Sequence, residues 1–250
     1  MLGWGLVAEC ELERIVVVSP HLDDAVLGCG QLLSAHPGAV VITVFAGNPD
    51  AYPVPQRPWD VISGFVPDDD VMAARRAEDI SALSSLGAIA HHLDFVEHSY
   101  NEAGNPVSPT LIAPTLADAI ASHSPTSVII PFGLANPDHG VTHDAATIAR
   151  EGLGSELSWF AYEDMGYNFI PGMLAWRVSE LFRSNLWPTK ASPSTDQSWD
   201  RKLAAIEHYP SQLLALEHDW NLSLKLASRP DEAYWRLEQP PQGWESLSAR

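Results

Sequence analysis

The sequence is poor in basic residues, in cysteine and in long hydrophobic runs. It has 14 lysines and arginines against 32 aspartates and glutamates, which gives a formal net charge of −18 at pH 7. A surface field of that sign repels polyanions, so we expect no nucleic-acid partner and no anionic membrane. The two cysteines, Cys10 and Cys29, fit neither a disulfide framework nor a Cys-x-x-Cys metal site, and their pairing state stays open.

The chain also lacks the features of exported and membrane proteins. No stretch approaches the roughly 18 consecutive apolar residues that are needed to cross a bilayer. Its first residues, MLGWGLVAECELERI, contain no basic segment followed by a continuous apolar run. We therefore expect a cytoplasmic protein. The 250 residues, 46% of them hydrophobic, suffice for one domain with a sizeable core, and a homo-oligomer remains possible.

Apolar, β-branched runs alternate with helical patterns over the first two thirds of the chain. The runs lie at residues 14–19, 40–46, 92–95, 127–132 and 157–162. The helical patterns lie at residues 24–36, 70–86, 110–122 and 142–152. Most of the runs are too uniformly apolar for a strand with one wet face. The alternation predicts an α/β fold, a Rossmann-like, mostly parallel sheet with helices on both faces.

Two regions lack this alternation of apolar runs and helical patterns. Residues 47–70 contain five prolines and predict a long loop, which in a compact domain is usually a lid or a substrate wall. Trp59 in this loop is the first candidate for stacking on a sugar ring, followed by Trp159, although most tryptophans are core residues. We expect a single domain over 1–250, with a core at about 14–165 and a C-terminal helical extension, about 166–250, that completes the pocket.

Two polar clusters follow predicted strands. VVVSPHLDDAVLGCG, residues 16–30, places His21, Asp23 and Asp24 after the first strand. GLANPDHGVTH, residues 133–143, follows the fourth. Ligands of open parallel sheets bind outside the carboxyl ends of the strands, so the two clusters face each other if these strands are neighbours.

Together the clusters contain the donors of a catalytic zinc site, which needs three protein ligands and one open position. His21 and Asp24, at i and i+3, supply two, and a distant His139 completes the set. Asp23 then stays free as a general base. The alternative is that the aspartates only cap a helix. His143, four residues after His139, is interpreted as a helix or outer-shell residue, and we expect structural or surface roles for His36, His91, His92, His98, His123, His208 and His218.

The segment PHLDDAVLGCG resembles the signature of the LmbE-like, PIG-L deacetylase family, and NPDH at 136–139 resembles its second motif, usually His-Pro-Asp-His. Five further segments resemble the branch that trims N-acetylglucosamine groups on glycopeptide-antibiotic intermediates. They are VFAGNP (44–49), DDDVMAARRAEDISALSSLG (68–87), HDAA (143–146), YEDMGY (162–167) and KLAAIEHYPSQ (202–212). The resemblance covers roughly residues 14–212.

This resemblance implies that His21, Asp24 and His139 bind one Zn²⁺ per chain and that Asp23 is the general base. It places Arg75 toward the active site. The alternative for Arg75 is a surface pair with Glu78 or Asp79, worth roughly 0.2 to 0.5 kcal/mol. The candidate substrate-binding residues are Arg75, Trp59, Glu163, Asp164 and Gln212.

One position departs from the family. Asn136 stands where relatives usually have the first histidine, which is thought to stabilise the oxyanion. An asparagine amide donates a hydrogen bond but carries no positive charge and transfers no proton. Asp138, which orients that histidine in relatives, loses this partner, and we expect it to bind Asn136 or His139. Asn136 and Asp138 complete the catalytic candidates with Asp23.

The leading hypothesis is a zinc-dependent hydrolase that removes an N-acetyl group from an amino sugar or its glycoside, releasing acetate and a free amine. One alternative is an amidase acting on a non-sugar N-acyl natural product or thiol conjugate. Another is a catalytically idle homologue that binds metal and glycan, in which Asn136 marks lost chemistry.

Overall fold

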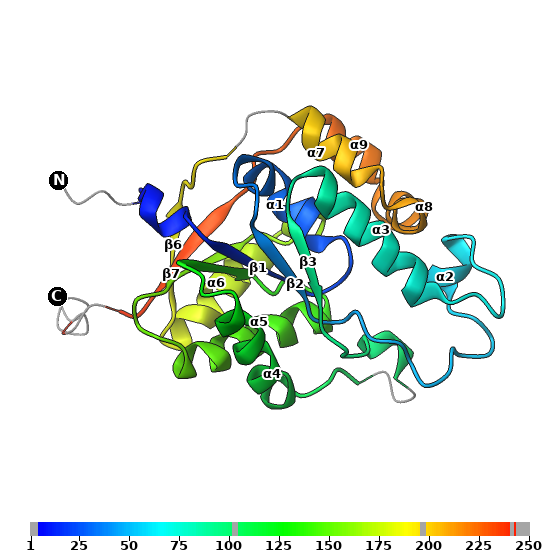
Figure 1. Ribbon diagram of the computed structural model, residues 1–250, viewed down its shortest axis with the longest axis horizontal. Coiled ribbons are helices and arrows are strands. Elements are labelled where there is room, and N and C mark those ends of the chain that lie inside the picture. The colour runs from blue at the N-terminus through cyan, green and yellow to red at the C-terminus, as the bar shows by residue number, and fades with distance from the viewer. Residues whose placement is uncertain (1–4, 102–104, 196–198, 241–242, 244–250) are drawn as a thin grey trace.

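Seven strands form one sheet in the order β3-β2-β1-β4-β5-β7-β6. The computed structural model describes residues 5–101, 105–195, 199–240 and 243 (Figure 1). The strands are β1 (Ile15–Ser19), β2 (Val40–Thr43), β3 (Ile89–His92), β4 (Ser127–Pro131), β5 (Ser158–Tyr162), β6 (Trp187–Ala191) and β7 (Tyr234–Glu238). The first five pair in parallel, whereas β7 pairs antiparallel to β5 and β6. The α/β prediction is confirmed.

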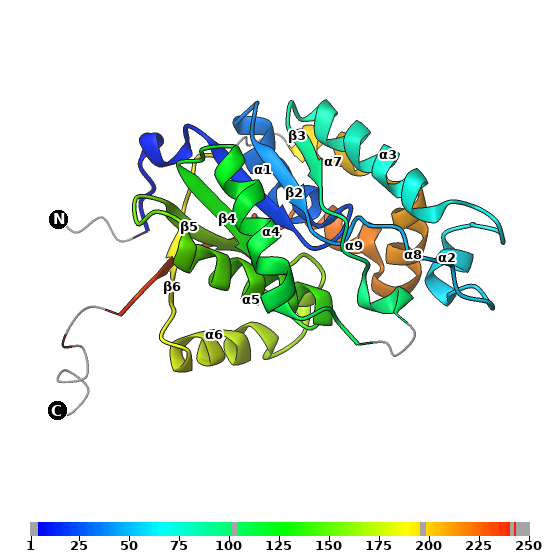
Figure 2. The same ribbon diagram turned by 60° about the horizontal axis from the view of Figure 1, so that its bottom comes forward.

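Helices cover both faces of this sheet (Figure 2). They are α1 (Asp24–Ala35), α2 (Pro58–Ile62), α3 (Val71–Ser85), α4 (Pro109–Ser122), α5 (Pro137–Gly152), α6 (Met173–Arg183), α7 (Trp199–Ile206), α8 (Pro210–Trp220) and α9 (Leu222–Ala227). Residues of α1, α3 and α7 form one apolar cluster against the sheet. Residues of α4, α5 and α6 form another on the opposite face. None of these described helices is long and apolar enough to span a membrane.

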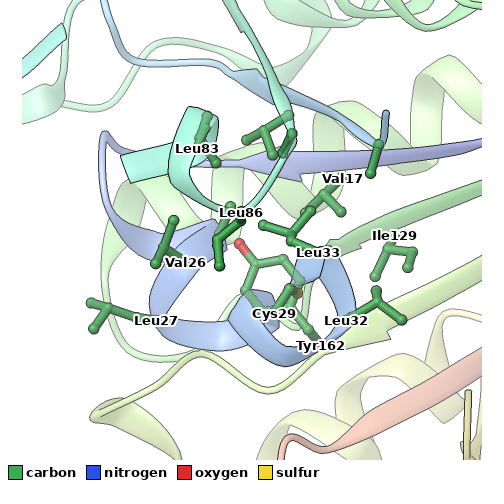
Figure 3. Packing of buried hydrophobic residues seen from close by; sticks show 14 of the residues in the cluster. Val17, Val26, Leu27, Cys29, Leu32, Leu33, Leu83, Leu86, Ile129 and Tyr162 are labelled. Atoms are coloured by element: carbon green, nitrogen blue, oxygen red, sulfur yellow. The ribbon is translucent and has the colours of Figure 1, made fainter. Parts of the chain in front are cut away.

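Helix α1 lies very close to the sheet because it carries glycine where it crosses β5. A Cβ on Gly28 would sit 2.5 Å from Cδ2 of Tyr162, closer than real atoms approach. Cys29, fully buried beside it, packs with Leu32 and Leu33 (Figure 3). Cys29 is therefore a small packing residue with a free thiol. The close contact holds the beginning of α1 firmly at the carboxyl end of β1.

Several boundaries differ from the sequence prediction. Helix α5 begins at Pro137 and not at residue 142, because Asn136 caps it and Pro137 is a favoured first residue. Strand β3 lies three residues earlier than predicted, and as an edge strand it exposes 53% of Ile89, which weakens the apolar signal. Helix α3 is capped by Asp70, whose side chain accepts a bond from the Ala73 N–H.

The C-terminal part was predicted incompletely. Helix α6 and strands β6 and β7 were not anticipated, and within the predicted helical extension α8 and α9 are separated at Asn221, whose φ is 50°. The predicted loop at residues 47–70 is mostly irregular but contains the short helix α2. For the site, the decisive feature is that β1 pairs directly with β4. The two polar clusters therefore meet at one edge of the sheet, as predicted.

Candidate metal and catalytic site

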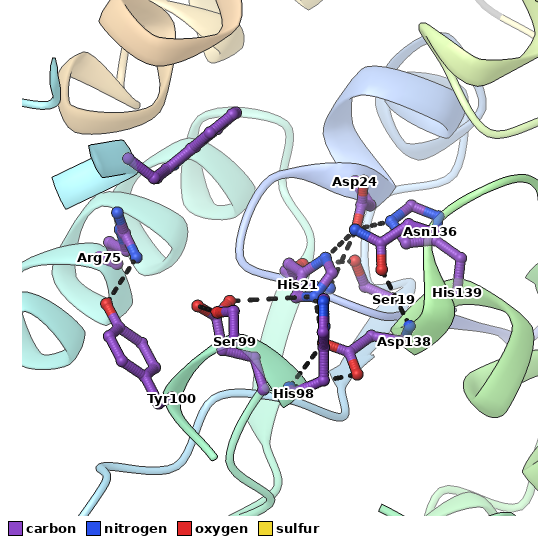
Figure 4. A network of polar contacts seen from close by, with 12 residues as sticks. Ser19, His21, Asp24, Arg75, His98, Ser99, Tyr100, Asn136, Asp138 and His139 are labelled. Atoms are coloured by element: carbon purple, nitrogen blue, oxygen red, sulfur yellow. Dashed lines mark hydrogen bonds and ion pairs between the residues drawn. The ribbon is translucent and has the colours of Figure 1, made fainter. Parts of the chain in front are cut away.

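Three predicted ligands converge at the ends of β1 and β4 (Figure 4). His21 Nδ1 lies 3.1 Å from Asp24 Oδ2, and His139 Nε2 lies 3.2 Å from the same oxygen. One donor atom from each residue falls within 4.8 Å of the others. In a tetrahedral zinc site with bonds of about 2.0 to 2.2 Å, ligand atoms lie about 3.3 to 3.5 Å apart. These three side chains therefore fit a divalent cation.

Each histidine of the triad has a carboxylate on its other ring nitrogen. His21 Nε2 lies 3.1 Å from Asp138 Oδ2, and His139 Nδ1 lies 2.7 Å from Asp164 Oδ1. Asp138 and Asp164 are both buried. Such an outer carboxylate fixes the tautomer and orientation of a metal-binding imidazole. The pairing is a second observation, independent of the triad, that fits a metal.

Carboxylates surround the two imidazoles of the triad, which favours a bound cation or a proton on each ring. Burial alone would lower the pKa of His139, but the carboxylates of Asp24 and Asp164 raise it to about 9. The pKa of His21 is likewise raised, against the effect of burial, by Asp138 and Asp24. Both imidazoles thus hold a proton when the carboxylates have no other counter-charge. A bound cation would compete with these protons for the same nitrogens.

Asp23 lies beside the triad without belonging to it. Asp23 is 8% exposed, and its carboxylate makes no capping bond to α1 and accepts no hydrogen bond from the described residues. The alternative in which Asp23 is only a helix cap is therefore wrong. Burial, followed by the nearby Asp24 charge, raises the pKa of Asp23 to about 8. A carboxyl group with this environment is suited to accepting and returning a proton near neutral pH.

Asn136 lines the cavity, but its amide is already engaged. Its Oδ1 accepts the Asp138 N–H at 2.9 Å, and its Nδ2 donates to the Tyr167 hydroxyl at 3.3 Å. The Asp138 carboxylate binds His21 and His98, so the expectation that it would bind Asn136 or His139 holds only for its backbone N–H. The Tyr167 ring in turn contacts the rings of His139 and Trp220 edge-on.

His98 and Glu97 reach the site although no sequence signal singled them out. Both line the cavity, and His98 Nδ1 lies 2.9 Å from Asp138 Oδ2. Glu97 accepts bonds from Ser99 and Arg57, and its Oε2 lies 3.9 Å from His21 Nε2. They sit in the irregular connection between β3 and α4. The tertiary fold brings Glu97 and His98 to the site, because no local spacing in the sequence predicts them.

The outer wall of the cavity contains three of the predicted substrate residues. Arg75, 3% exposed, donates to Asp60 at 2.9 Å and to Tyr100 at 3.2 Å, so its alternative as a surface pair with Glu78 or Asp79 is wrong. Trp59 Nε1 donates to Gln212 Oε1 at 3.0 Å. Arg75, Trp59 and Gln212 line a cavity of about 240 Å³ together with the triad.

Glu163 and Asp164 do not line this cavity, contrary to the prediction. Asp164 lies behind His139 and also accepts the N–H groups of Gly133 and Leu134. Glu163 faces the other way and binds Lys190 and Trp235. The segment YEDMGY contributes Tyr167 instead, placed by Gly166, whose φ of 91° favours glycine.

Two other residues are structural. Trp159, the second tryptophan considered for sugar stacking, is 3% exposed and belongs to the apolar core. His143 is 1% exposed, its Nδ1 donates to the Pro131 carbonyl at 2.8 Å, and it lies outside the metal triad. Burial, reinforced by Arg177, lowers the pKa of His143 to about 3, which keeps it neutral.

Comparison with known proteins agrees with this geometry. Residues 16–150 match the family model of PIG-L, GlcNAc-PI de-N-acetylase, which is more than half of the chain. The chain therefore belongs to the PIG-L family. The match spans both polar clusters and ends within α5, so it includes the whole triad together with Asp23. A search of curated proteins found no match.

Solved structures extend the similarity to most of the chain. A deacetylase triple mutant from the teicoplanin biosynthetic pathway is 25% identical with a TM-score of 0.75, over 92% of this chain and 100% of that one. The A40926 pseudoaglycone deacetylase is 29% identical with a TM-score of 0.71, over 91% and 98%. The zinc-inhibited form of teicoplanin deacetylase is 25% identical with a TM-score of 0.72, over 92% and 100%.

Proposed function

We propose that this protein is a zinc-dependent N-deacetylase that removes the acetyl group from an N-acetylated amino sugar of a glycoconjugate, releasing acetate and a free amine. The observation that carries the proposal is the arrangement of His21, Asp24 and His139 around one point, with Asp23 beside them and unliganded. We assign one Zn²⁺ per chain to this triad. The family and the deacetylases that resemble the chain support the reaction class.

The size of the cavity supports a sugar at the end of a larger molecule. Its volume of about 240 Å³ is below the roughly 300 to 1,000 Å³ of ordinary small-molecule sites, so it suits one terminal group. The remainder of a glycoconjugate would lie outside. Trp59, Tyr167 and Trp220 line the cavity and offer flat faces to the apolar side of a sugar ring.

Different residues of the site carry out different parts of the reaction. A cation held by the triad would polarise the acyl carbonyl and make water more acidic. Asp23 takes a proton from the attacking water and returns it to the leaving nitrogen as the carbon–nitrogen bond breaks. Asp138 and Asp164 keep the two imidazoles in orientation throughout. The buried setting of Asp23 raises its pKa toward the range in which one carboxyl group can do both tasks.

The test is acetate release from a panel of N-acetylglucosaminides, with and without a glycopeptide aglycone, by zinc-loaded protein. We expect release that a chelator abolishes and that Asp23→Asn lowers by roughly 10² to 10⁴ in kcat with zinc still bound. Asp144→Asn is the matched control, because this carboxylate lies outside the cavity. Near-native turnover by zinc-loaded Asp23→Asn would falsify the proposal.

A further inference from the structure

The hydroxyl group of Tyr167 is a polar group of the cavity that the reaction scheme above does not use. The way in which Asn136 caps helix α5 determines the direction of this hydroxyl's hydrogen. The Asn136 side chain caps this helix through Oδ1, so the amide has only its NH₂ group to offer to the cavity side. That NH₂ group donates to the Tyr167 oxygen at 3.3 Å. The tyrosine is therefore an acceptor in this bond, and its own hydrogen must point elsewhere.

No acceptor for that hydrogen exists in the part of the chain that the structure describes. Tyr167 lines the cavity with Asp23, Asn136 and His139, so a donor without a partner faces the space where a substrate would bind. A hydroxyl whose oxygen already accepts a bond is also a better donor, because adjacent hydrogen bonds polarise each other. The Asn136 amide thus donates to the Tyr167 hydroxyl, and this hydroxyl is free to donate to an acceptor that none of the described residues supplies.

The ring that carries this hydroxyl is held in place. It meets the His139 ring edge-on, with centroids 5.1 Å apart, and the Trp220 ring edge-on at 5.0 Å. His139 is a metal-binding candidate on α5, and Trp220 ends α8, so two elements distant in sequence fix the tyrosine. An ordinary tyrosine hydroxyl titrates at about pH 10, so at neutral pH this group is a neutral O–H donor.

We propose that Tyr167, oriented by Asn136, is a catalytic residue that donates a hydrogen bond to the acyl oxygen as this oxygen becomes an oxyanion. The inference rests on the proposed deacetylation. When water adds to the acetyl carbon, the carbonyl double bond becomes a single bond and its oxygen gains negative charge. A fixed neutral donor beside that oxygen stabilises the charge without transferring a proton. Asn136 and Tyr167 would thus together stabilise the oxyanion, a role that a single cationic side chain would otherwise fill.

Tyr167→Phe is the decisive variant, because it removes one oxygen and retains both ring contacts. We expect kcat to fall by roughly 10² to 10³, the effect of losing one oxyanion donor elsewhere, while zinc content and KM stay unchanged. Asn136→Asp keeps the helix cap but turns the donor into an acceptor, so it should lower kcat similarly. The double variant should be no slower than either single one. Tyr234→Phe is the matched control, since its hydroxyl binds Glu232 away from the cavity.

A binding measurement separates this role from a structural one and does not depend on turnover. A methylphosphonamidate analogue of the substrate carries a tetrahedral centre with charged oxygens in place of the acetyl group. Tyr167→Phe should weaken its binding by the same factor as kcat, yet leave binding of intact substrate to an Asp23→Asn background within about threefold. Unchanged affinity for the phosphonamidate, or kcat within about threefold of wild type, overturns the inference. If wild type releases no acetate, the proposed function fails, while the phosphonamidate comparison still decides the role of Tyr167.

Discussion

The parallel and antiparallel parts of the sheet contribute differently to the site. The parallel part, β1 to β5 with the beginnings of α1 and α5, supplies the candidate metal triad and Asp23 from residues that follow buried strands. The C-terminal part, from residue 166 onward, supplies Tyr167, Gln212 and Trp220 and closes the cavity. The two histidines of the candidate triad have buried carboxylates behind them, whereas the closing residues are held by contacts with side chains distant in sequence. The positions of the triad follow from the pairing of β1 with β4, whereas those of the closing residues depend on docking of the C-terminal part.

The largest effect is expected from a variant that weakens the docking of the C-terminal part on the parallel part. Glu232 is paired with the buried Lys202 at 2.7 Å and also accepts the N–H groups of Gln31 and Leu32 inside α1. Glu232→Ala leaves a buried cation and two backbone donors without this partner, so we expect a loss of about 3 to 5 kcal/mol in the free energy of unfolding. Urea denaturation measures it.

The paired variant gives that result its control. Lys202→Met should cost less, because the Glu232 carboxylate keeps its two backbone donors and the Tyr234 hydroxyl. Among the described residues, Lys202 by contrast retains the Trp199 ring, 5.0 Å from its Nζ, when Glu232 is removed. Equal losses from the two variants would show that Glu232 docks only through the ion pair.

The next largest effect concerns the rigidity of the metal-binding part. Asp164→Asn replaces the carboxylate that holds His139 Nδ1 at 2.7 Å. We expect the zinc dissociation constant to rise roughly 10- to 100-fold, because the imidazole loses its fixed tautomer and some basicity. Competition with a chromophoric chelator measures this constant. Glu163→Gln is the neighbouring control, and a comparable rise there would remove the special role of Asp164.

A pH series probes the contact between the antiparallel part and the chain start. Glu11 binds Arg236 of β7 at 2.7 Å, and this bond, despite burial, lowers the pKa of Glu11 from 4.5 to about 2. Because the folded state binds its proton less readily, the stabilisation is complete above pH 4.5 and is lost as pH falls toward 2. We expect wild type to exceed Glu11→Gln by at most about 2 kcal/mol at pH 7, with the difference shrinking below pH 4.5. A constant difference across this window contradicts the assignment.

The smallest effect is expected at the outer wall. Gln212→Leu removes the acceptor of the Trp59 Nε1–H, a bond of 3.0 Å between α2 and α8. One neutral hydrogen bond contributes about 1 kcal/mol, so KM should rise about fivefold with kcat and zinc affinity unchanged. Steady-state kinetics measures both constants. Ser81→Ala, which removes a bond to His208 outside the cavity, is the control. A larger change in kcat than in KM would move Gln212 into the chemistry.

Much of the metal-binding part follows from local sequence. Uniform apolar runs mark β1 and β4 because both faces of a parallel sheet are covered. The polar residues directly after them lie at one sheet edge by the geometry of parallel strands, so His21, Asp24 and His139 are predictable together. The start of α5 has a cap signal, Asn136 followed by Pro137, but the helix was predicted to begin only at residue 142. The antiparallel strands β6 and β7 had no comparable signal, because a mixed, half-covered edge shows weaker alternation.

What the sequence by itself determined is the set of donors: two clusters at strand ends with the residue types and spacing of a metal site and a separate base. Only the tertiary structure decided which carboxylate supports which histidine, that Asp164 lies behind His139, and that His98 and Tyr167 reach the cavity. The physical reason is the range of the interactions. A ligand set on adjacent strands is fixed by hydrogen-bond register over a few residues, whereas these partners are positioned by packing of elements far apart in the chain.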